Sequence, residues 1–381
     1  MSRRDALAGR LARLKKDGLS PPVKKTHGKV INQPFKLSHL DGWSEISPYV
    51  WKKTVSYENP LNEVYPQSLL LPQETRSDNL IFYDTETTGL STGAGTIPFL
   101  IGIGCVNDRR FEITQLFLAD YPGEIHLLEE LNRLFREDAV FVSYNGKTYD
   151  SHLINTRFLM NGLRVKKRQE VDLLYTSRRL WKNILDNCRL GTIEKEIMSI
   201  TRGPDIPGAE IPDVWFDFLK TGDTEKLERV FSHNLQDIYS LSLLLHQIEE
   251  IIEGKASHLS YDRFSLGRTL LFHNRHEGIN LLQQELDRGN RKAGEFLSLY
   301  WKRHGEWDKS VAIWQRMNHR GYHYFSVEEL AKFYEHKAKD YREALKYIDK
   351  ILKGPVPPAQ EIREKLIHRK KRLLLKLEKE V

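Results

Sequence analysis

Residues 79–90 read NLIFYDTETTGL and bring two carboxylates to the end of an apolar run. Residues 80–83 have the length and the aromatic, branched content of a buried strand, and Asp84 and Glu86 follow directly. Because strand side chains alternate between faces, these two acids point to the same side and repel one another unless they share a proton or bind a hard cation. Oxygen ligands of this kind suit Mg²⁺ or Mn²⁺. The alternative is an acid pair that faces solvent in a turn.

The positive charge of the chain is concentrated at its start. The 381 residues carry a formal net charge of +7, and residues 1–30 hold nine Lys and Arg against two Asp, which accounts for the whole excess. A basic arm over residues 1–35 predicts attraction to a polyanion, most simply nucleic acid, with a plain solubilising tail as the alternative.

The cysteines and the apolar runs indicate the compartment. Cys105 and Cys188 are the two cysteines and lie far apart, so no disulfide framework is predicted. No apolar segment follows the charged N-terminal residues, and no run of 18 apolar residues occurs, so neither export nor membrane spanning is expected. We therefore expect a reducing cytoplasm.

Composition divides the chain into four parts. The basic arm at 1–35 is followed by residues 36–76, in which aromatics are separated by polar and proline residues, and which we interpret as an irregular extension packed on the next domain. Residues 77–252 have the pattern of an α/β domain. Residues 257–381 have the pattern of helices alone.

Within the α/β part the order of elements is informative. Runs at 80–83, 99–106 and 111–118 predict three antiparallel strands, with Asn107 and Asp108 as a hairpin turn. A helix at 125–135, a strand at 139–144 and a helix at 151–161 complete the order of a ribonuclease-H-like fold. Further helices are predicted at 171–181, 192–197, 214–219 and 224–252.

The C-terminal region contains a repeat. Three residues recur after 34 positions, Tyr300, Trp307 and Trp314 as Tyr334, Tyr341 and Ile348. A period of 34 with two helices per block predicts tetratricopeptide-like helical hairpins, with an ordinary helical bundle as the alternative.

Two further stretches place acids on helices. In SYNGKTYDSHLINTR, residues 143–157, a glycine ends a strand and Asp150 opens the following helix, where helix capping is the alternative role. In FSHNLQDIYSL, residues 231–241, His233 and Asp237 are four apart and share a helix face, where a local hydrogen bond is the alternative.

Together, DTETTG at 84–89, NGKTYD at 145–150 and HNLQD at 233–237 resemble, in order and spacing, the three exonuclease motifs of the DEDD superfamily of proofreading-type 3′-5′ exonucleases. The chain is similar to the bacterial YprB-type branch of this group. That resemblance implies an α/β ribonuclease-H-like exonuclease domain, a mixed sheet flanked by helices, followed by an all-α tetratricopeptide-like repeat domain.

The resemblance also implies roles for individual residues. Four acids would be the ligands of two divalent metal ions, Mg²⁺ or Mn²⁺: Asp84, Glu86, Asp150 and Asp237. Substrate contacts would come from Thr85, Thr87, Asn145 and Tyr149. His233 would be the general base for the attacking water. The histidine branch usually has four residues between His and Asp, and this chain has three, so the sequence leaves the base role of His233 open.

Three functions follow. The first is a metal-dependent nuclease on single-stranded DNA or RNA, most simply a two-metal 3′-5′ exonuclease whose repeats bind a protein partner. The second is a non-catalytic scaffold for nucleic acid or protein with a vestigial site. A ribonuclease-H-type endonuclease is the third, and it is disfavoured because both acids of Asp84-x-Glu86 lie on the first strand.

Overall fold

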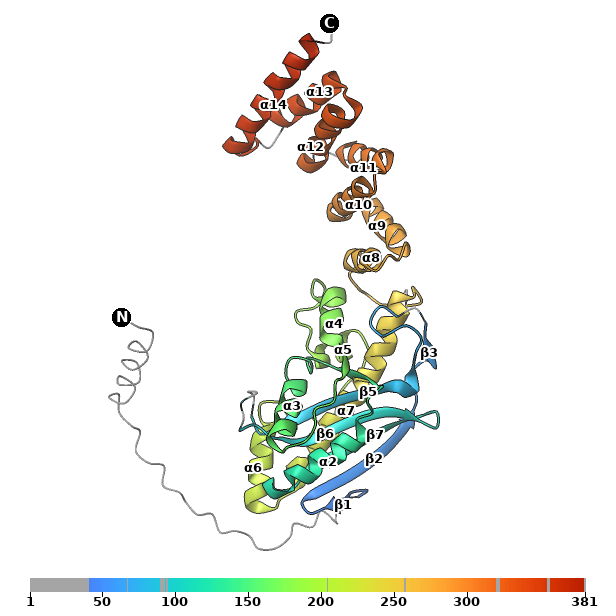
Figure 1. Ribbon diagram of the computed structural model, residues 1–381, viewed down its shortest axis with the longest axis vertical. Coiled ribbons are helices and arrows are strands. Elements are labelled where there is room, and N and C mark those ends of the chain that lie inside the picture. Colours follow the sequence, from blue (N-terminus) through green and yellow to red (C-terminus); the bar gives the residue numbers. More distant parts are fainter. Residues whose placement is uncertain are drawn as a thin grey trace, which may run out of the picture.

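The structure, a computed structural model, describes residues 41–379 except 67, 90–92, 94, 204, 257, 320–322 and 355–356. An α/β region built on one large sheet is followed by a column of helices that leads away from it (Figure 1). The predicted basic arm at 1–35 lies outside the described residues.

Among the described residues, seven strands form the large sheet, in the order β1-β2-β7-β6-β5-β8-β9. Their bounds are β1 Ser44–Ser47, β2 Val50–Glu58, β5 Leu80–Thr87, β6 Pro98–Asn107, β7 Arg110–Leu118, β8 Val140–Ser143 and β9 Gln169–Asp172. The pairs from β1 to β5 are antiparallel, whereas β8 and β9 run parallel to β5. A separate ribbon pairs β3, Val64–Tyr65, with β4, Thr75–Arg76. The sheet is therefore mixed, as the sequence predicted.

The expectation of an irregular extension over residues 36–76 is wrong for β1 and β2. Strand β2 pairs with β7 along its whole length, from Val50 opposite Leu118 to Glu58 opposite Arg110. Polar side chains of β2 meet polar partners across the strands, as in the 3.0 Å hydrogen bond between the Thr54 and Thr114 hydroxyls. Because these partners lie some 60 residues away in the chain, no local sequence pattern predicted strand β2.

In the described part of the chain, the α/β region contains six α-helices. They are α2 Glu124–Leu134, α3 Asp150–Met160, α4 Leu173–Trp181, α5 Leu190–Glu196, α6 Ile211–Thr221 and α7 Glu225–Ile252, with short 3₁₀ turns at Ser77–Asn79 and Tyr121–Gly123. Ile81 and Tyr83 of β5 lie in a core with α2 and α3, whereas Leu80 and Phe82 lie in a second core with α7. Strand β5 is thus buried on both faces, and its even-numbered residues face α7.

Helix α7 lies close to the sheet because β6 has glycine where the two cross. A Cβ on Gly102 would come within 2.9 Å of Ile238 Cγ1, and one on Gly104 within 2.6 Å of Ile238 Cγ2. Real Cβ atoms are not found at such distances, so larger residues at these positions would push α7 outward. The spacing between α7 and β5, where the candidate acids lie, depends on these glycines.

The C-terminal region is all-helical, as predicted. Its helices are α8 Arg263–Phe272, α9 Glu277–Asp287, α10 Arg291–Arg303, α11 Trp307–His319, α12 Tyr324–Phe333, α13 Tyr341–Leu352 and α14 Gln360–Glu378, with a π-helical turn at Tyr334–Ala338. Trp314 of α11 and Ile348 of α13, which are 34 residues apart, are both fully buried. The tetratricopeptide-like assignment stays a prediction.

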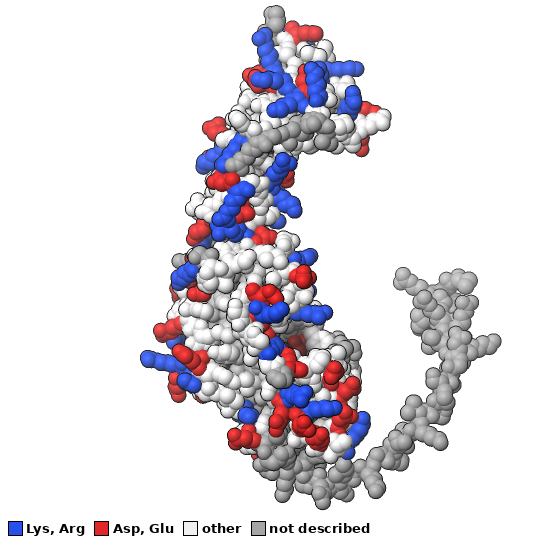
Figure 2. Space-filling model, turned by 180° about the vertical axis from the view of Figure 1, so that it is seen from behind, with Lys and Arg blue, Asp and Glu red and all other residues white. Residues whose placement is uncertain are grey.

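Lys and Arg side chains gather on the end of the column formed by α13 and α14 (Figure 2). Several of them are neutralised locally, because Arg369, Arg372 and Lys376 of α14 all contact the buried Glu335. Of the described helices, none is long and apolar enough to cross a membrane.

Glu249 of α7 generates a prediction about stability. Its side chain is fully buried, Oε1 accepts a 2.5 Å hydrogen bond from Ser68 Oγ, and burial raises its pKa from 4.5 to about 7. The folded state therefore favours the protonated form, and stability falls as pH rises from 4.5 to about 7. Wild type should therefore lose about 2 kcal/mol more of its free energy of unfolding than Glu249→Gln when the pH is raised from about 5.5 to 8.

Urea unfolding at both pH values measures this difference. Glu228→Gln, at an exposed position of the same helix, is the matched control and should follow wild type. If the free energy of unfolding of Glu249→Gln has the same pH dependence as that of wild type, Glu249 is ionised in the folded protein and the prediction is wrong.

Candidate active site

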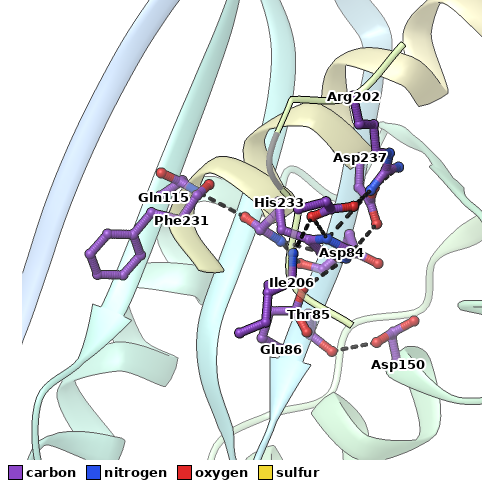
Figure 3. A network of polar contacts seen from close by, with 12 residues as sticks. Asp84, Thr85, Glu86, Gln115, Asp150, Arg202, Ile206, Phe231, His233 and Asp237 are labelled. Atoms are coloured by element: carbon purple, nitrogen blue, oxygen red, sulfur yellow. Dashed lines mark hydrogen bonds and ion pairs between the residues drawn. The ribbon is translucent and has the colours of Figure 1, made fainter. Parts of the chain in front are cut away.

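Four carboxylates from three elements come together at one end of β5. Asp84 and Glu86 come from β5, Asp150 is the first residue of α3, and Asp237 lies on α7 (Figure 3). Asp150 is 6% exposed, and the side chains of Glu86 and Asp237 are 13% and 17% exposed. The structure thus brings together the four acids that the sequence singled out.

Strand alternation decides how each acid approaches. Asp84 and Glu86 face α7, and Asp84 Oδ2 accepts a 3.1 Å hydrogen bond from Asn234 Nδ2. Thr85 points the other way, toward α3, and its hydroxyl donates to Asp150 Oδ1. The Thr85 side chain is therefore used to hold Asp150.

Burial and mutual repulsion disturb the ionisation of these acids. Burial raises the pKa of Asp84 well above its usual range, and the nearby Asp237 and Asp150 carboxylates raise it further. The pKa of Glu86 is raised well above normal by burial and then by Asp84. Burial also raises the pKa of Asp150 to about 7 and raises that of Asp237. The cluster needs protons or cations to be stable.

The donor set fits hard divalent cations, because it consists of several carboxylates that repel one another. Among the described residues, however, no three His, Cys, Asp or Glu side chains already have a ligating arrangement. Three of the four acids have another hydrogen-bond partner: Asn234 for Asp84, Thr85 for Asp150 and the Arg202 guanidinium for Asp237. Arg202 supplies the positive charge that a bound cation would otherwise bring.

The ring of His233 reaches the cluster despite its three-residue separation from Asp237. Its Nε2 lies 3.6 Å from Asp237 Oδ2 and 3.9 Å from Glu86 Oε1. Its Nδ1 lies 2.7 Å from Asp205 Oδ1, on the side away from the cluster. The hydrogen bond with His233 helps to hold the pKa of Asp205 below its usual value, against the opposing effect of partial burial. One nitrogen of His233 is therefore held while the other faces the acids.

Arg202, Glu194 and Asp205 were not singled out by the sequence analysis. Arg202 Nε donates to Glu194 Oε2 at 2.5 Å, and Nη1 donates to Asp205 Oδ2 at 3.2 Å. Glu194 is fully buried on α5, whereas Arg202 and Asp205 lie in the connection between α5 and α6. A connecting segment has no periodicity, so no signal in the sequence pointed to them.

A buried amide pair orients Asn234. Gln115 Nε2 donates to Asn234 Oδ1 at 3.0 Å and to the Phe231 carbonyl at 2.8 Å. The Asn234 amide oxygen is thereby occupied, and its NH₂ group is directed at Asp84. Asn234 is fully buried and lies between His233 and Asp237 in the sequence, a position that could have drawn attention to it.

The remaining predicted residues lie around the end of β5. Thr87 Oγ1 and Tyr149 Oη both donate to the Gly89 carbonyl, at 2.7 and 2.6 Å. Asn145 has a positive φ of 64°, and its backbone N–H donates to Asp172 Oδ1 at 2.8 Å. Its exposed side chain accepts a 3.3 Å hydrogen bond from Thr148 Oγ1.

Comparison with known proteins places this site in a family. A family model described as the RNase_H superfamily matches residues 81–249, which contain all four acids and His233. The uncharacterized protein YprB of Bacillus subtilis (strain 168) is 33% identical over 345 residues, which cover 87% of this chain and 82% of YprB.

Solved structures are more distant. The family B DNA polymerase of Pyrobaculum calidifontis is 14% identical, with a TM-score of 0.36 over 68% of this chain and 34% of the polymerase. E. coli exonuclease I in complex with a dT13 oligonucleotide is 15% identical, with a TM-score of 0.26 over 40% of this chain and 42% of the exonuclease. The matched part spans less than half the length of either structure. The identity to YprB and the matched domain show that the chain belongs to the YprB family, with a ribonuclease-H-like domain that carries the four acids.

Proposed function

We propose that this protein is a divalent-metal-dependent nuclease that removes nucleotides from the 3′ end of single-stranded nucleic acid. The observation that carries the proposal is the convergence of Asp84, Glu86, Asp150 and Asp237 on one end of β5, with His233 Nε2 facing them. The placement of Asp84 and Glu86 on a single strand supports the exonuclease over the endonuclease. The 3′-5′ direction rests on the resemblance of the three motifs to the DEDD group.

The four acids would hold two divalent ions, Mg²⁺ or Mn²⁺. When bound, the ions supply Lewis-acid chemistry by lowering the pKa of water and offsetting the charge that develops on the phosphate. The chain contributes a rigid frame, because Asp84, Glu86 and Asp150 are positioned by strand pairing and by the Thr85 and Asn234 hydrogen bonds. Such pre-organisation lowers the cost of arranging charge during the reaction.

We assign His233 as the general base. Asp205 accepts the Nδ1–H of His233, which leaves Nε2 as the unprotonated nitrogen on the side of the acids. Nε2 would take the proton of the attacking water, and the imidazolium formed would be stabilised by Asp205. Asp205 is a positioning residue in this assignment, because it acts through His233.

Thr87, Tyr149 and Asn145 would position the terminal nucleotide. Their placement at the end of β5 and at the start of α3 supports this role, since both elements also carry the metal-binding acids. Thr85 would contribute through its backbone and through Asp150.

A non-catalytic scaffold is the second candidate, and one observation favours it. Arg202 already neutralises Asp237, and the described acids have no ready-made ligating arrangement. This arrangement is expected for a vestigial site in which the Arg202 guanidinium takes the place of a metal ion. The two candidates differ in whether a divalent ion competes with Arg202 for Asp237.

The first test is hydrolysis of 5′-labelled single-stranded DNA and RNA with Mg²⁺ or Mn²⁺. Wild type should yield a ladder that shortens stepwise from the 3′ end, and Asp84→Ala should reduce the rate at least 10³-fold because it removes one of the four acids that would hold the ions. Glu58→Ala, an exposed acid on β2, should cleave like wild type. No cleavage of either polymer by folded wild type would favour the scaffold, and internal cuts would favour the endonuclease.

A double-mutant cycle tests the pairing of His233 with Asp205. His233→Ala should lower kcat about 10²-fold or more with little change in KM, and Asp205→Asn should lower it less. The double variant should be no slower than His233→Ala, because Asp205 acts only through the imidazole. His246→Ala, elsewhere on α7, is the control. Additive losses would contradict the assignment.

Thermal unfolding with and without Mn²⁺ tests the competition at Asp237. Without metal, Arg202→Gln should lower Tm, because it leaves the buried Glu194 without its cation. Saturating Mn²⁺ should raise the Tm of Arg202→Gln more than that of wild type, and should scarcely raise that of Asp84→Ala. If Mn²⁺ raises the Tm of all three proteins equally, the ion does not bind at the four acids.

A further inference from the structure

A pocket of about 510 Å³ lies where the α/β region meets the column of helices. Three arginines line it, Arg179 from α4, Arg268 from α8 and Arg303 from α10, and no described Asp or Glu does. Hydroxyl groups and aromatic rings make up much of the remaining wall, including Tyr300 and Phe272. Its lining is therefore cationic and aromatic without compensating negative charge.

These arginines differ from the other cations of the column. Arg263, Lys302 and Arg316 each contact a carboxylate, as do many others on α8 to α14. By contrast, none of the three pocket arginines contacts a carboxylate of the described chain within 4.0 Å. Arginines clustered without counter-ions repel one another, so the pocket has an electrostatic preference for an anion.

The geometry of Arg268 adds a second feature. Its guanidinium lies 5.2 Å from the ring centroid of Phe296 and 5.4 Å from that of Phe264. The cation is therefore held over aromatic faces while its edge N–H groups stay available to oxygen ligands. Phe272, which is 84% exposed, offers a further ring at the pocket wall. Phosphate oxygens and flat bases are the groups that guanidinium and aromatic faces bind in single-stranded nucleic acid.

Helix α4 connects this pocket to the candidate active site. Asp172 caps the start of α4 through Leu174 N, at 3.0 Å, and also accepts from Asn145 N in the loop that leads to Asp150. Arg179 lies seven residues further on, about 10 Å along the helix axis. Tyr175 is 48% exposed and precedes Arg179 by four residues, so both side chains lie on one face of α4. An exposed ring thus lies between the loop and the pocket.

The junction is held in place by direct hydrogen bonds. Asp262 N donates to the Leu180 carbonyl at 2.8 Å, and Trp181 Nε1 donates to the Ser260 carbonyl at 3.0 Å. Asn183 Nδ2 adds a 2.7 Å bond to Asp262 Oδ2. Since α8 begins at Arg263, these bonds fix its start against the end of α4, and the arginines from both regions are positioned before any ligand binds.

We propose that this junction pocket binds the upstream, 5′-ward part of the single-stranded nucleic acid whose 3′ end lies at the four acids, with Tyr175 stacking on a base between the two. This inference rests on the proposed nuclease function for the direction of the strand. The helical column would then contribute to substrate binding through α8 and α10, and longer strands would bind more tightly than short ones.

Binding of a fluorescein-labelled 20-nucleotide DNA or RNA strand to the full chain in EDTA tests the proposal without hydrolysis. The double variant Arg179→Glu/Arg303→Glu should raise Kd at least tenfold. Removing two phosphate contacts should also reduce the slope of log K against log salt by about 1.4. Arg342→Glu/Lys350→Glu, on exposed positions of α13, makes the same change in net charge and should leave Kd within about twofold of wild type. An unchanged Kd in the pocket variant, or an equal loss in the control, would overturn the proposal.

Tyr175 provides an independent measurement that does not reverse any charge. Tyr175→Ala should raise Kd at least fivefold, whereas Tyr175→Phe, which keeps the ring, should bind like wild type. Equal binding by the alanine variant would remove Tyr175 from the path of the strand.

Hydrolysis then separates this inference from the nuclease proposal. The pocket variant should lose at least ten times more kcat/KM on the 20-nucleotide strand than on a dinucleotide, which is too short to reach the pocket. Equal losses on both substrates would contradict the upstream site. A wild-type protein that binds the long strand through Arg179 and Arg303 but cleaves nothing would instead refute the nuclease proposal and keep the binding site.

Discussion

The repulsion among four carboxylates in one poorly exposed space is the constraint on which the candidate site depends. Two unit charges 4 Å apart interact by about 4 kcal/mol at an effective dielectric constant of 20, so several ionised acids cannot remain together without positive charge. In the chain alone, Arg202 provides part of that charge at Asp237, and His233 faces Glu86. The same repulsion makes the cluster a favourable place for hard divalent ions.

The fold maintains this unfavourable arrangement by holding the four acids on three separate elements, β5, α3 and α7. Strand β5 lies between β6 and β8, which keeps Asp84 and Glu86 in register. Helix α7 can approach because Gly102 and Gly104 lack side chains, and the Gln115–Asn234 pair directs an amide at Asp84. The two hydrophobic cores on either face of the sheet stabilise the fold, and this stability offsets the repulsion among the acids at the end of β5.

Sequence reasoning succeeded where the determinants were local. Asp84 and Glu86 directly follow an apolar strand, and His233 and Asp237 share a helix face. These patterns indicated the α/β domain, and the resemblance of the three motifs together to the DEDD group implied the set of four acids. Sequence reasoning failed where partners are distant in sequence. Strand β2 was missed because its register is set by β7, and Arg202 and Asp205 were missed because a connection without periodicity gives no indication of what it will contact. The fold also showed that the shorter spacing still brings His233 to the acids.

In the proposed function, the α/β region holds the metal-dependent centre, and its junction with the helices binds the rest of the strand. Anomalous diffraction from crystals soaked in Mn²⁺ tests the central claim most directly, because it locates the ions without requiring turnover. The account predicts Mn²⁺ peaks within ligating distance of Asp84 and Asp237, with the Arg202 guanidinium moved away from Asp237. Crystals in which Arg202 still contacts Asp237, and in which no Mn²⁺ lies among the four acids, would contradict it.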